Sequence, residues 1–280
     1  MELSVRLKTV AEAVTKGNRV ADIGTDHGYV PIYLVKNKLS PGGIAMDVNK
    51  GPLEKAQEHI REEKLGGKIA TRLGNGLAPL ESEETDTVVI AGMGGDLICK
   101  ILKAKPEFLI EGKEFILQPQ SEWFKVRQLL KEYHYRIEKE WFLKEDDKYY
   151  VIIKAKPEQS CNVEQKQNGT LSQQDRMQNV DRNTDRAVEE TNHFSDDPES
   201  MEDVYEQYGR YLIETRNPVL IEYLEREITK KEGIAESLKQ SIDSIMQGNL
   251  SEKEKSNITK RQKRYQELQK EIEDMRKAIR

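Results

Sequence analysis

The side chains of Asp26 and His27 lie in a short turn whose residue types favour chemistry beside a bound ligand. The turn follows an apolar run that ends at Asp22, and it is bracketed by Gly24 and Gly28. Glycines at a strand-to-helix turn let the backbone approach a nucleotide-like ligand closely, and the amides of the helix start favour a negative group. A dinucleotide-binding turn is usually rich in glycine and has no titratable side chains at these positions. The carboxyl and imidazole groups therefore indicate a reaction next to a cofactor.

Three further predicted strand ends carry residues that suit a nucleoside. Asp47 ends an apolar run, where a carboxylate accepts hydrogen bonds from ribose hydroxyls, although a helix N-cap or turn would also use it. Asn75, within the GNG of residues 74–76, offers a donor and an acceptor to an adenine edge, or serves only a turn. The AGMGG of residues 91–95 leaves room for a flat ligand, unless its glycines only ease a helix start.

The remaining candidates each have a structural alternative. Gln118 could hydrogen-bond a base edge while Pro119 stiffens its loop, but turn chemistry explains both nearly as well. Tyr29 directly follows the glycine turn and could stack on a base or join the core. His27 could orient Asp26, touch a cofactor or serve only the structure, and Asp22 is interpreted as a carboxylate that orders the loop.

A regular alternation of apolar strands and amphipathic helices must position these residues. Strands are expected over residues 19–24, 43–48, 69–73, 86–91 and 114–118, and helices over 3–16, 29–37, 52–64, 96–102 and 123–133. Two closing strands, 135–143 and 148–156, read as a hairpin. Such alternation predicts an α/β fold with a parallel sheet and with ligands at the carboxyl ends of its strands. A closing antiparallel hairpin is what methyltransferase-type sheets add to this plan.

The rest of the chain divides into a polar segment and a helical one. Residues 158–202 have few apolar side chains and no sustained period, so we expect a disordered insertion or linker. Within 203–280, residues 221–245 and 258–279 alternate apolar spacings of three and four, which predicts two coiled-coil helices. A capping box at Ser251 and Glu254 should start the second helix. Because the helices can fold back and bury each other's seams, we expect an antiparallel hairpin and a monomer.

Bulk composition limits the other classes of protein. The chain has 280 residues and a formal net charge of −5, which neither requires nor excludes a nucleic-acid partner. Cys99 and Cys161 give neither a disulfide framework nor metal-ligand spacing. The N-terminus lacks the apolar core of a signal peptide, and no run of about 18 apolar residues exists. We therefore expect a cytoplasmic protein with no metal and no membrane segment.

The motifs together resemble a known family. The segments DIGTDHGYVPIYLV, AMDVNKGPLEKA, RLGNGL, IAGMGGDLI and ILQPQ, in this order and spacing, are similar to the bacterial TrmK family. That family consists of S-adenosylmethionine-dependent tRNA methyltransferases that modify N1 of adenine 22. The resemblance covers residues 1–157 and resumes over about 203–280. It implies a class I Rossmann-like fold, S-adenosylmethionine as cofactor and tRNA as substrate, with a C-terminal coiled-coil hairpin.

The resemblance also implies roles for individual residues. Asp26 and Tyr29 are expected to be catalytic, with Asp26 accepting a hydrogen bond from the exocyclic amino group of the target base. The expected cofactor-binding residues are Asp22, Gly24, Thr25, His27, Gly28, Asp47, Val48, Asn75, Gly76, Ala91, Gly92 and Met93. The expected substrate-binding residues are Gly94, Gly95, Gln118, Pro119, Lys260, Arg261, Lys263 and Arg264. The last four form a basic edge that could instead be an ordinary solvated helix face.

Two features depart from the family pattern, and other functions stay open. Asn75 stands where many class I methyltransferases place Asp, and the 158–202 insertion is longer and more polar than expected. The alternatives are a methyltransferase of another RNA or of a small molecule, a nicotinamide-dependent oxidoreductase, and a non-catalytic RNA-binding protein. The glycine spacing around Asp26 does not fit the GxGxxG of nicotinamide-binding turns.

Overall fold

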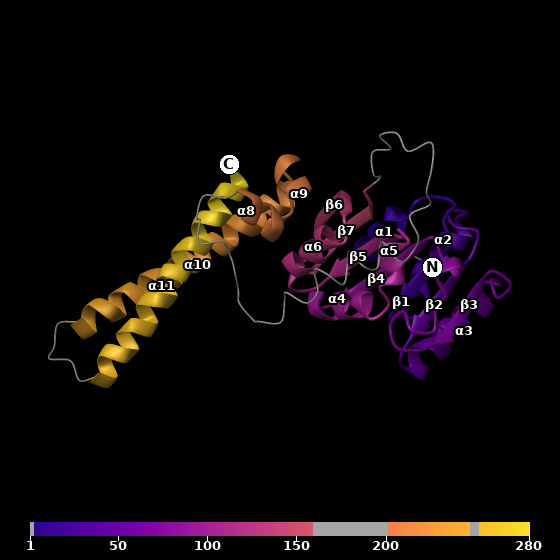
Figure 1. Cartoon of the computed structure of the whole chain (residues 1–280), viewed down its shortest axis with the longest axis horizontal. Helices are drawn as coiled ribbons and strands as arrows, with labels where there is room; N and C mark the ends of the chain where they lie inside the picture. The colour runs from indigo at the N-terminus through magenta and orange to yellow at the C-terminus, as the bar shows by residue number, and fades with distance from the viewer. Residues whose placement is uncertain (1–2, 159–200, 247–251) are drawn as a thin grey trace, which may run out of the picture. The chain divides into compact units, whose positions relative to one another are not determined.

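The fold consists of two compact units joined within one chain. The computed structural model describes residues 3–158, 201–246 and 252–280. The first unit runs to Lys139 and resumes at Ile152, and the second combines Glu140–Val151 with the C-terminal helices. The predicted linker lies almost entirely outside the described residues, and so does Ser251 of the predicted capping box. Figure 1 shows the elements in chain order.

A seven-stranded sheet forms the framework of the first unit. Its strands are β1 (Val20–Ile23), β2 (Gly43–Asp47), β3 (Ile69–Leu73), β4 (Thr87–Met93), β5 (Glu114–Pro119), β6 (Tyr135–Glu145) and β7 (Lys148–Pro157), in the spatial order β3-β2-β1-β4-β5-β7-β6. The first five strands pair in parallel, and β7 pairs antiparallel with β5. Every residue of β1 and β5 is buried, which explains their continuous apolar runs. The predicted α/β class I methyltransferase sheet is confirmed.

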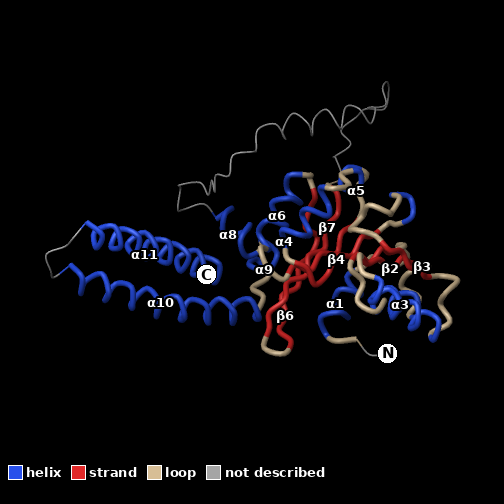
Figure 2. Tube along the Cα trace, turned by 90° about the horizontal axis from the view of Figure 1, so that it is seen from below, coloured by secondary structure: helices blue, strands red, loops and turns tan. Residues whose placement is uncertain are grey.

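Helices cover both faces of this sheet. They are α1 (Val5–Ala13), α2 (Tyr29–Lys36), α3 (Lys50–Glu62), α4 (Gly95–Lys103), α5 (Glu107–Ile110) and α6 (Trp123–Glu132), with a short 3-10 turn, η1 (Ser82–Glu84). Figure 2 shows α4 and α6 on one side of the sheet, and α1 and α3 on the other. The order of the strands reverses between β1 and β4. The helix after β1, α2, packs with α1 on one face of the sheet, and the helix after β4, α4, lies on the other face. Open α/β sheets bind ligands at such a switch point, outside the carboxyl ends of the strands.

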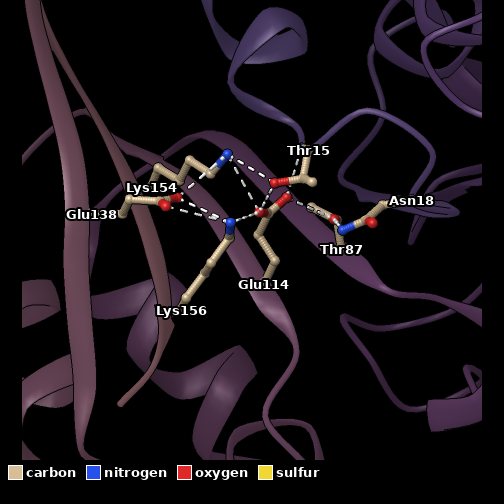
Figure 3. A network of polar contacts seen from close by, with 7 residues as sticks. All are labelled: Thr15, Asn18, Thr87, Glu114, Glu138, Lys154 and Lys156. Atoms are coloured by element: carbon tan, nitrogen blue, oxygen red, sulfur yellow. Dashed lines mark hydrogen bonds and ion pairs between the residues drawn. The ribbon is translucent and has the colours of Figure 1, made fainter. Parts of the chain in front are cut away.

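A buried carboxylate organises the opposite, amino end of the same strands. Glu114 begins β5 with a side chain only 4 % exposed. It accepts hydrogen bonds from the backbone amide of Thr15 at 2.9 Å and from the hydroxyl of Thr87 at 2.8 Å. Lys154 and Lys156 of β7 lie 3.4 and 3.5 Å from the same carboxylate. Figure 3 shows this network, which fastens the end of α1 and the antiparallel strand to the parallel sheet.

The second unit contains the predicted helical hairpin. Its helices are α8 (Met201–Tyr208), α9 (Arg210–Glu214), α10 (Pro218–Met246) and α11 (Glu252–Ile279). Figure 2 shows α10 and α11 side by side along their length. Their facing seam buries Leu220, Leu224, Ala235 and Ile242 of α10 against Ile258, Leu268, Ile272, Met275 and Ala278 of α11. The heptad pattern therefore predicted the pairing correctly.

The tip of the β6–β7 hairpin belongs to the second unit. Glu222 on α10 accepts hydrogen bonds from Lys144 and from the hydroxyl of Tyr149, both at 2.9 Å. The rings of Phe142 and Tyr149 pack against Tyr223 with centroids 5.5 and 5.0 Å away. The sequence-based boundary at residue 157 places this tip in the first domain, whereas its packing places it with the helices.

Candidate active site

The loops that follow β1, β2 and β3 are tied together by backbone hydrogen bonds. The amides of Gly24 and Thr25 both donate to the carbonyl oxygen of Met46, at 2.8 and 2.7 Å. The amide of Gly74 donates to the carbonyl oxygen of Asp47 at 2.9 Å. Three predicted cofactor loops therefore share one edge of the sheet, as parallel strands require.

Gly24 marks where the first loop meets the carboxyl end of β4. It has a φ of +74°, and a Cβ atom placed on it would lie 2.2 Å from the methyl carbon of Met93. Gly92, at an irregularity near the end of β4, also has a left-handed conformation, with a φ of +81°. A side chain at position 24 would thus be strained by the positive φ and would displace the side chain of Met93. Residues predicted from different strands to bind the cofactor are brought together here.

Asp22 lies behind the first loop. Its side chain is buried, and its carboxylate accepts a hydrogen bond of 2.5 Å from the hydroxyl of Thr25, which is also buried. Burial raises the pKa of Asp22 to about 6, the Thr25 hydroxyl opposes that shift, and the charges of Asp26 and Asp47 add to it. This geometry supports the interpretation of Asp22 as a residue that orders the loop.

The raised pKa of Asp22 predicts a specific pH dependence of stability. The folded state holds the proton more tightly than the unfolded chain, so the free energy of unfolding should fall as pH rises from about 4 to about 6. The ionised carboxylate then costs roughly 3 kcal/mol. Asp22→Asn keeps an acceptor for Thr25 and should remove that loss. Urea unfolding of both proteins without ligand, from pH 4 to 7, tests this. A difference between them that does not change with pH would contradict it.

Asp26 projects from the loop toward solvent. Its side chain is 78 % exposed, and its carboxylate lies 3.0 Å from Nε2 of His27. His27 has a φ of +61° and Gly28 a φ of +72°, so the backbone makes two successive left-handed steps here. This unusual path presents the carboxylate outward while the imidazole steadies it.

A group of parallel rings stands beside this carboxylate. His27 and Tyr29 stack with centroids 5.3 Å apart and planes 8° apart. His59 of α3 joins them, 5.7 Å from His27 and 5.4 Å from Tyr29. Sequence reasoning missed His59, because it lies within an ordinary amphipathic helix with no motif around it. Tyr29 is half-buried and in contact with both histidines, and its stacking on a base stays a prediction.

Residues after β2 and β3 form a partly apolar shelf. Val48 and Leu73 are 61 % and 48 % exposed, and Leu73 pairs with Asp47 in the sheet. Exposed large aliphatic side chains at the ends of two neighbouring strands suit the face of a planar ring. One carboxylate oxygen of Asp47 accepts from the amide of Asn49 at 2.7 Å, and Asn75 is exposed beside them.

Gln118 lies behind the carboxyl end of β4 rather than at the mouth of the site. The side chain is fully buried. Its oxygen accepts from Arg6 at 2.9 Å and from the amide of Gly92 at 3.1 Å, and its nitrogen donates to the carbonyl of Pro119 at 3.3 Å. The buried amide is held by two donors on its oxygen and one acceptor on its nitrogen, which favours a structural role over the predicted base contact. Pro119 is buried beside it.

Gly94 and Gly95 allow the loops after β4 and β5 to pack together. The amide of Gly95 donates to the carbonyl of Ser121 at 2.9 Å. A Cβ atom on Gly95 would lie 2.5 Å from the carbonyl oxygen of Glu122 and 2.7 Å from that of Ser121. The glycine is required by this close approach. Substrate contacts of Gly94 and Gly95 stay a prediction.

The four predicted basic contacts lie in the second unit and differ from one another. Arg264 is paired with Glu267 at 3.1 Å and with Glu271 at 3.0 Å. Arg261 donates a hydrogen bond to Ser241. Lys260 and Lys263 are exposed, and within the described helices neither makes an ion pair. The two lysines are therefore the members of this edge that are most available to a polyanion.

The described ranges contain neither a cluster of metal-binding side chains nor a membrane-spanning helix. In residues 3–158, 201–246 and 252–280, no group of three or more His, Cys, Asp or Glu side chains has an arrangement that could hold a metal ion. No helix in the same ranges is long and apolar enough to cross a membrane.

Comparisons with known proteins agree with this geometry. Residues 3–153 match the family described as "Methyltransferase domain". The chain is 39% identical over 155 residues to a tRNA (adenine(22)-N(1))-methyltransferase of Bacillus subtilis, covering 55% of this chain and 65% of that enzyme. The crystal structure of TrmK from B. subtilis superposes with a TM-score of 0.70 at 28% identity, covering 100% of this chain and 99% of that one. TrmK of M. capricolum in complex with S-adenosyl-homocysteine gives 0.67 at 27% identity, with both chains fully covered.

Proposed function

The chain belongs to the methyltransferase-domain family, and from this premise we propose that it transfers a methyl group from S-adenosylmethionine to N1 of adenine 22 in tRNA. The observation that carries the proposal is the outward carboxylate of Asp26, held by His27 at the carboxyl edge of the sheet. The similarity of the chain to the B. subtilis enzyme and to structures of TrmK supports the proposal. So does the resemblance of the motifs from DIGTDHGY to IAGMGG to that family.

The residues at the edge of the sheet fit the proposed cofactor. Asp47 would accept hydrogen bonds from the ribose hydroxyls, and the shelf of Val48 and Leu73 would face the adenine ring. Gly24 brings the backbone of the first loop within contact of Met93, so both predicted cofactor residues lie at one place. When bound there, S-adenosylmethionine supplies an electrophilic sulfonium methyl group.

The chain's own groups would then align and stabilise the base. The N1 lone pair of adenine forms the new bond to the methyl carbon, while the bond from that carbon to sulfur breaks and its electron pair stays on sulfur. The product base carries the positive charge, so no general base is required before attack. Asp26 would accept a hydrogen bond from the exocyclic amino group and stabilise the arriving cation. Tyr29 and the histidine rings beside it would stack on the extruded base.

Methyl transfer to a defined tRNA tests this function. The protein is incubated with S-adenosylmethionine labelled in its methyl group and with unmodified tRNA, and the digested nucleosides are then separated. We expect the label in 1-methyladenosine. Label in another nucleoside would support a different RNA methyltransferase, and no transfer to any tRNA, despite cofactor binding, would support a small-molecule substrate. Binding of NAD in place of S-adenosylmethionine would support an oxidoreductase.

We also infer that Lys260 and Lys263 contact the tRNA backbone. A lysine that neutralises one phosphate releases counterions, so its removal should make the plot of log affinity against log salt shallower by roughly one unit. Lys260→Ala and Lys263→Ala should each do this. Arg264→Ala removes the same charge from a side chain already paired with two glutamates, and it should change the slope less. Equal slopes in all three variants and the wild type would contradict the inferred contacts.

The predicted monomer and cytoplasmic location belong to the same proposal. The α10–α11 seam is buried within one chain, so it leaves no need for a second copy. A tRNA substrate would place the reaction in the cytoplasm. Light scattering on the purified protein tests the first point, because a mass of two chains would contradict it.

A further inference from the structure

Helix α3 contacts the turn that contains Asp26 and His27 through two of its residues, which lie one helical turn apart. A Cβ atom on Gly28 would lie 3.2 Å from the Cβ of Ala56, so helix and turn are in tight contact there. Three residues further along α3, Nδ1 of His59 lies 3.0 Å from the carbonyl oxygen of His27. Positions three apart share a helix face, which brings both contacts onto the same turn.

The contact from His59 has a defined direction. A backbone carbonyl only accepts, so Nδ1 of His59 must carry the proton that it donates. No second donor reaches this carbonyl among the hydrogen bonds of the described residues. The residue that it holds, His27, has a φ of +61°, which few non-glycine residues adopt. Such a conformation persists when its surroundings over-determine it.

The ring of His59 adds a second restraint. It lies 5.7 Å from the His27 ring and 5.4 Å from the Tyr29 ring, with planes 24° and 16° apart. His27 in turn lies 3.0 Å from the carboxylate of Asp26. A continuous set of contacts thus leads from α3 through His27 to the exposed carboxylate.

We infer that His59 is a positioning residue for methyl transfer, which sets the orientation of Asp26 through the carbonyl and ring of His27. The inference rests on the proposed function, since it takes Asp26 as the group that meets the target base. His59 itself touches no reacting atom. Its loss should therefore affect the catalytic step more than the binding of either substrate.

Two substitutions separate the hydrogen bond from the ring. His59→Asn keeps an N–H donor one bond beyond Cγ, where Nδ1 stands, but has no ring. His59→Phe keeps a ring without a donor. Histidine, asparagine and phenylalanine have similar helix propensities, so α3 itself should be affected equally. We expect kcat of His59→Phe to fall about tenfold, the rate equivalent of one net hydrogen bond, with KM for tRNA and Kd for S-adenosylmethionine within about twofold. We expect His59→Asn to recover most of that kcat.

Wild-type kcat in His59→Phe would overturn the inference. So would equal losses in both variants, or a loss explained entirely by KM or by cofactor affinity. The wild-type protein is measured in the same assay, so a wild type that methylates no tRNA would count against the proposed function instead.

A second readout does not depend on activity. Amide hydrogen exchange over residues 25–29 should be several-fold faster in His59→Phe than in the wild type, and close to wild type in His59→Asn. Exchange in α6 serves as the internal control for general destabilisation. Unchanged exchange over 25–29 in His59→Phe would show that the hydrogen bond does not hold the turn, and would overturn the inference whatever the enzyme assay gives.

Discussion

Replacing Asp26 by alanine is expected to lower kcat for tRNA methylation by roughly 10²- to 10³-fold, the usual cost of removing one preorganised electrostatic group. The reason is that the carboxylate is exposed to solvent beside the glycine turn, where the proposed reaction would form a cationic base. Kd for S-adenosylmethionine should change only a few-fold, because the shelf, Asp47 and the glycine loops are left intact. Rapid-quench kinetics with labelled cofactor, together with equilibrium binding, measure both quantities.

Two matched variants show whether the fall in kcat of Asp26→Ala comes from the lost charge. Asp26→Asn keeps an acceptor for the exocyclic amino group but has no charge, so its kcat should lie between the wild type and Asp26→Ala. Glu58→Ala removes an exposed carboxylate from neighbouring α3 and should leave kcat unchanged. Full activity of Asp26→Ala would remove Asp26 from the mechanism.

The second large effect concerns stability rather than catalysis. Glu114→Ala should lower the free energy of unfolding of the first unit by about 3–5 kcal/mol, because it removes the buried partner of an ion-pair network and leaves two lysines with only the half-buried Glu138. Lys154, whose side chain is 14 % exposed, would lose its buried counter-ion. The hydroxyl of Thr87 and the amide of Thr15 would lose their acceptor.

Urea unfolding followed by tryptophan fluorescence measures this change. The chain has two tryptophans, and Trp141→Phe leaves Trp123 in α6 as the reporter of the first unit. Glu138→Ala is the control, because Glu138 pairs with the same two lysines but has a side chain 35 % exposed. It should cost about 1 kcal/mol or less. A cost at Glu114 no larger than that at Glu138 would refute the assigned role.

The sheet was predictable because its signals are local. Buried parallel strands such as β1 and β5 contain continuous apolar runs, with a glycine directly after β1 and a proline at the end of β5. Five predicted strands and their helices therefore match the structure to within two residues, except that α1 ends at Ala13, three residues before its predicted end. The four-residue α5 and the three-residue η1 were missed, since a segment that short has no measurable period.

The site was less predictable where residues distant in sequence decide the role of a side chain. Gln118 accepts a hydrogen bond from Arg6, which lies 112 positions earlier, and no residue near position 118 indicates that contact. His59 acts on His27 from 32 positions away. The hairpin tip reads as part of the sheet until Glu222, more than 70 positions later, is seen to bind it. Residues within the glycine turn, such as Asp22, Thr25 and Asp26, were interpretable because their partners are neighbours.

The most direct test of the central claim maps the methyl group on the tRNA. Two transcripts that differ only at position 22, one with adenine and one with guanine, are each incubated with the protein and S-adenosylmethionine. A methyl group on N1 blocks base pairing, so reverse transcription stops at the modified residue. We predict a stop at position 22 of the adenine transcript and neither a stop nor methyl incorporation with the guanine transcript. Methylation that persists with guanine at 22, or a stop elsewhere, would contradict the proposed function.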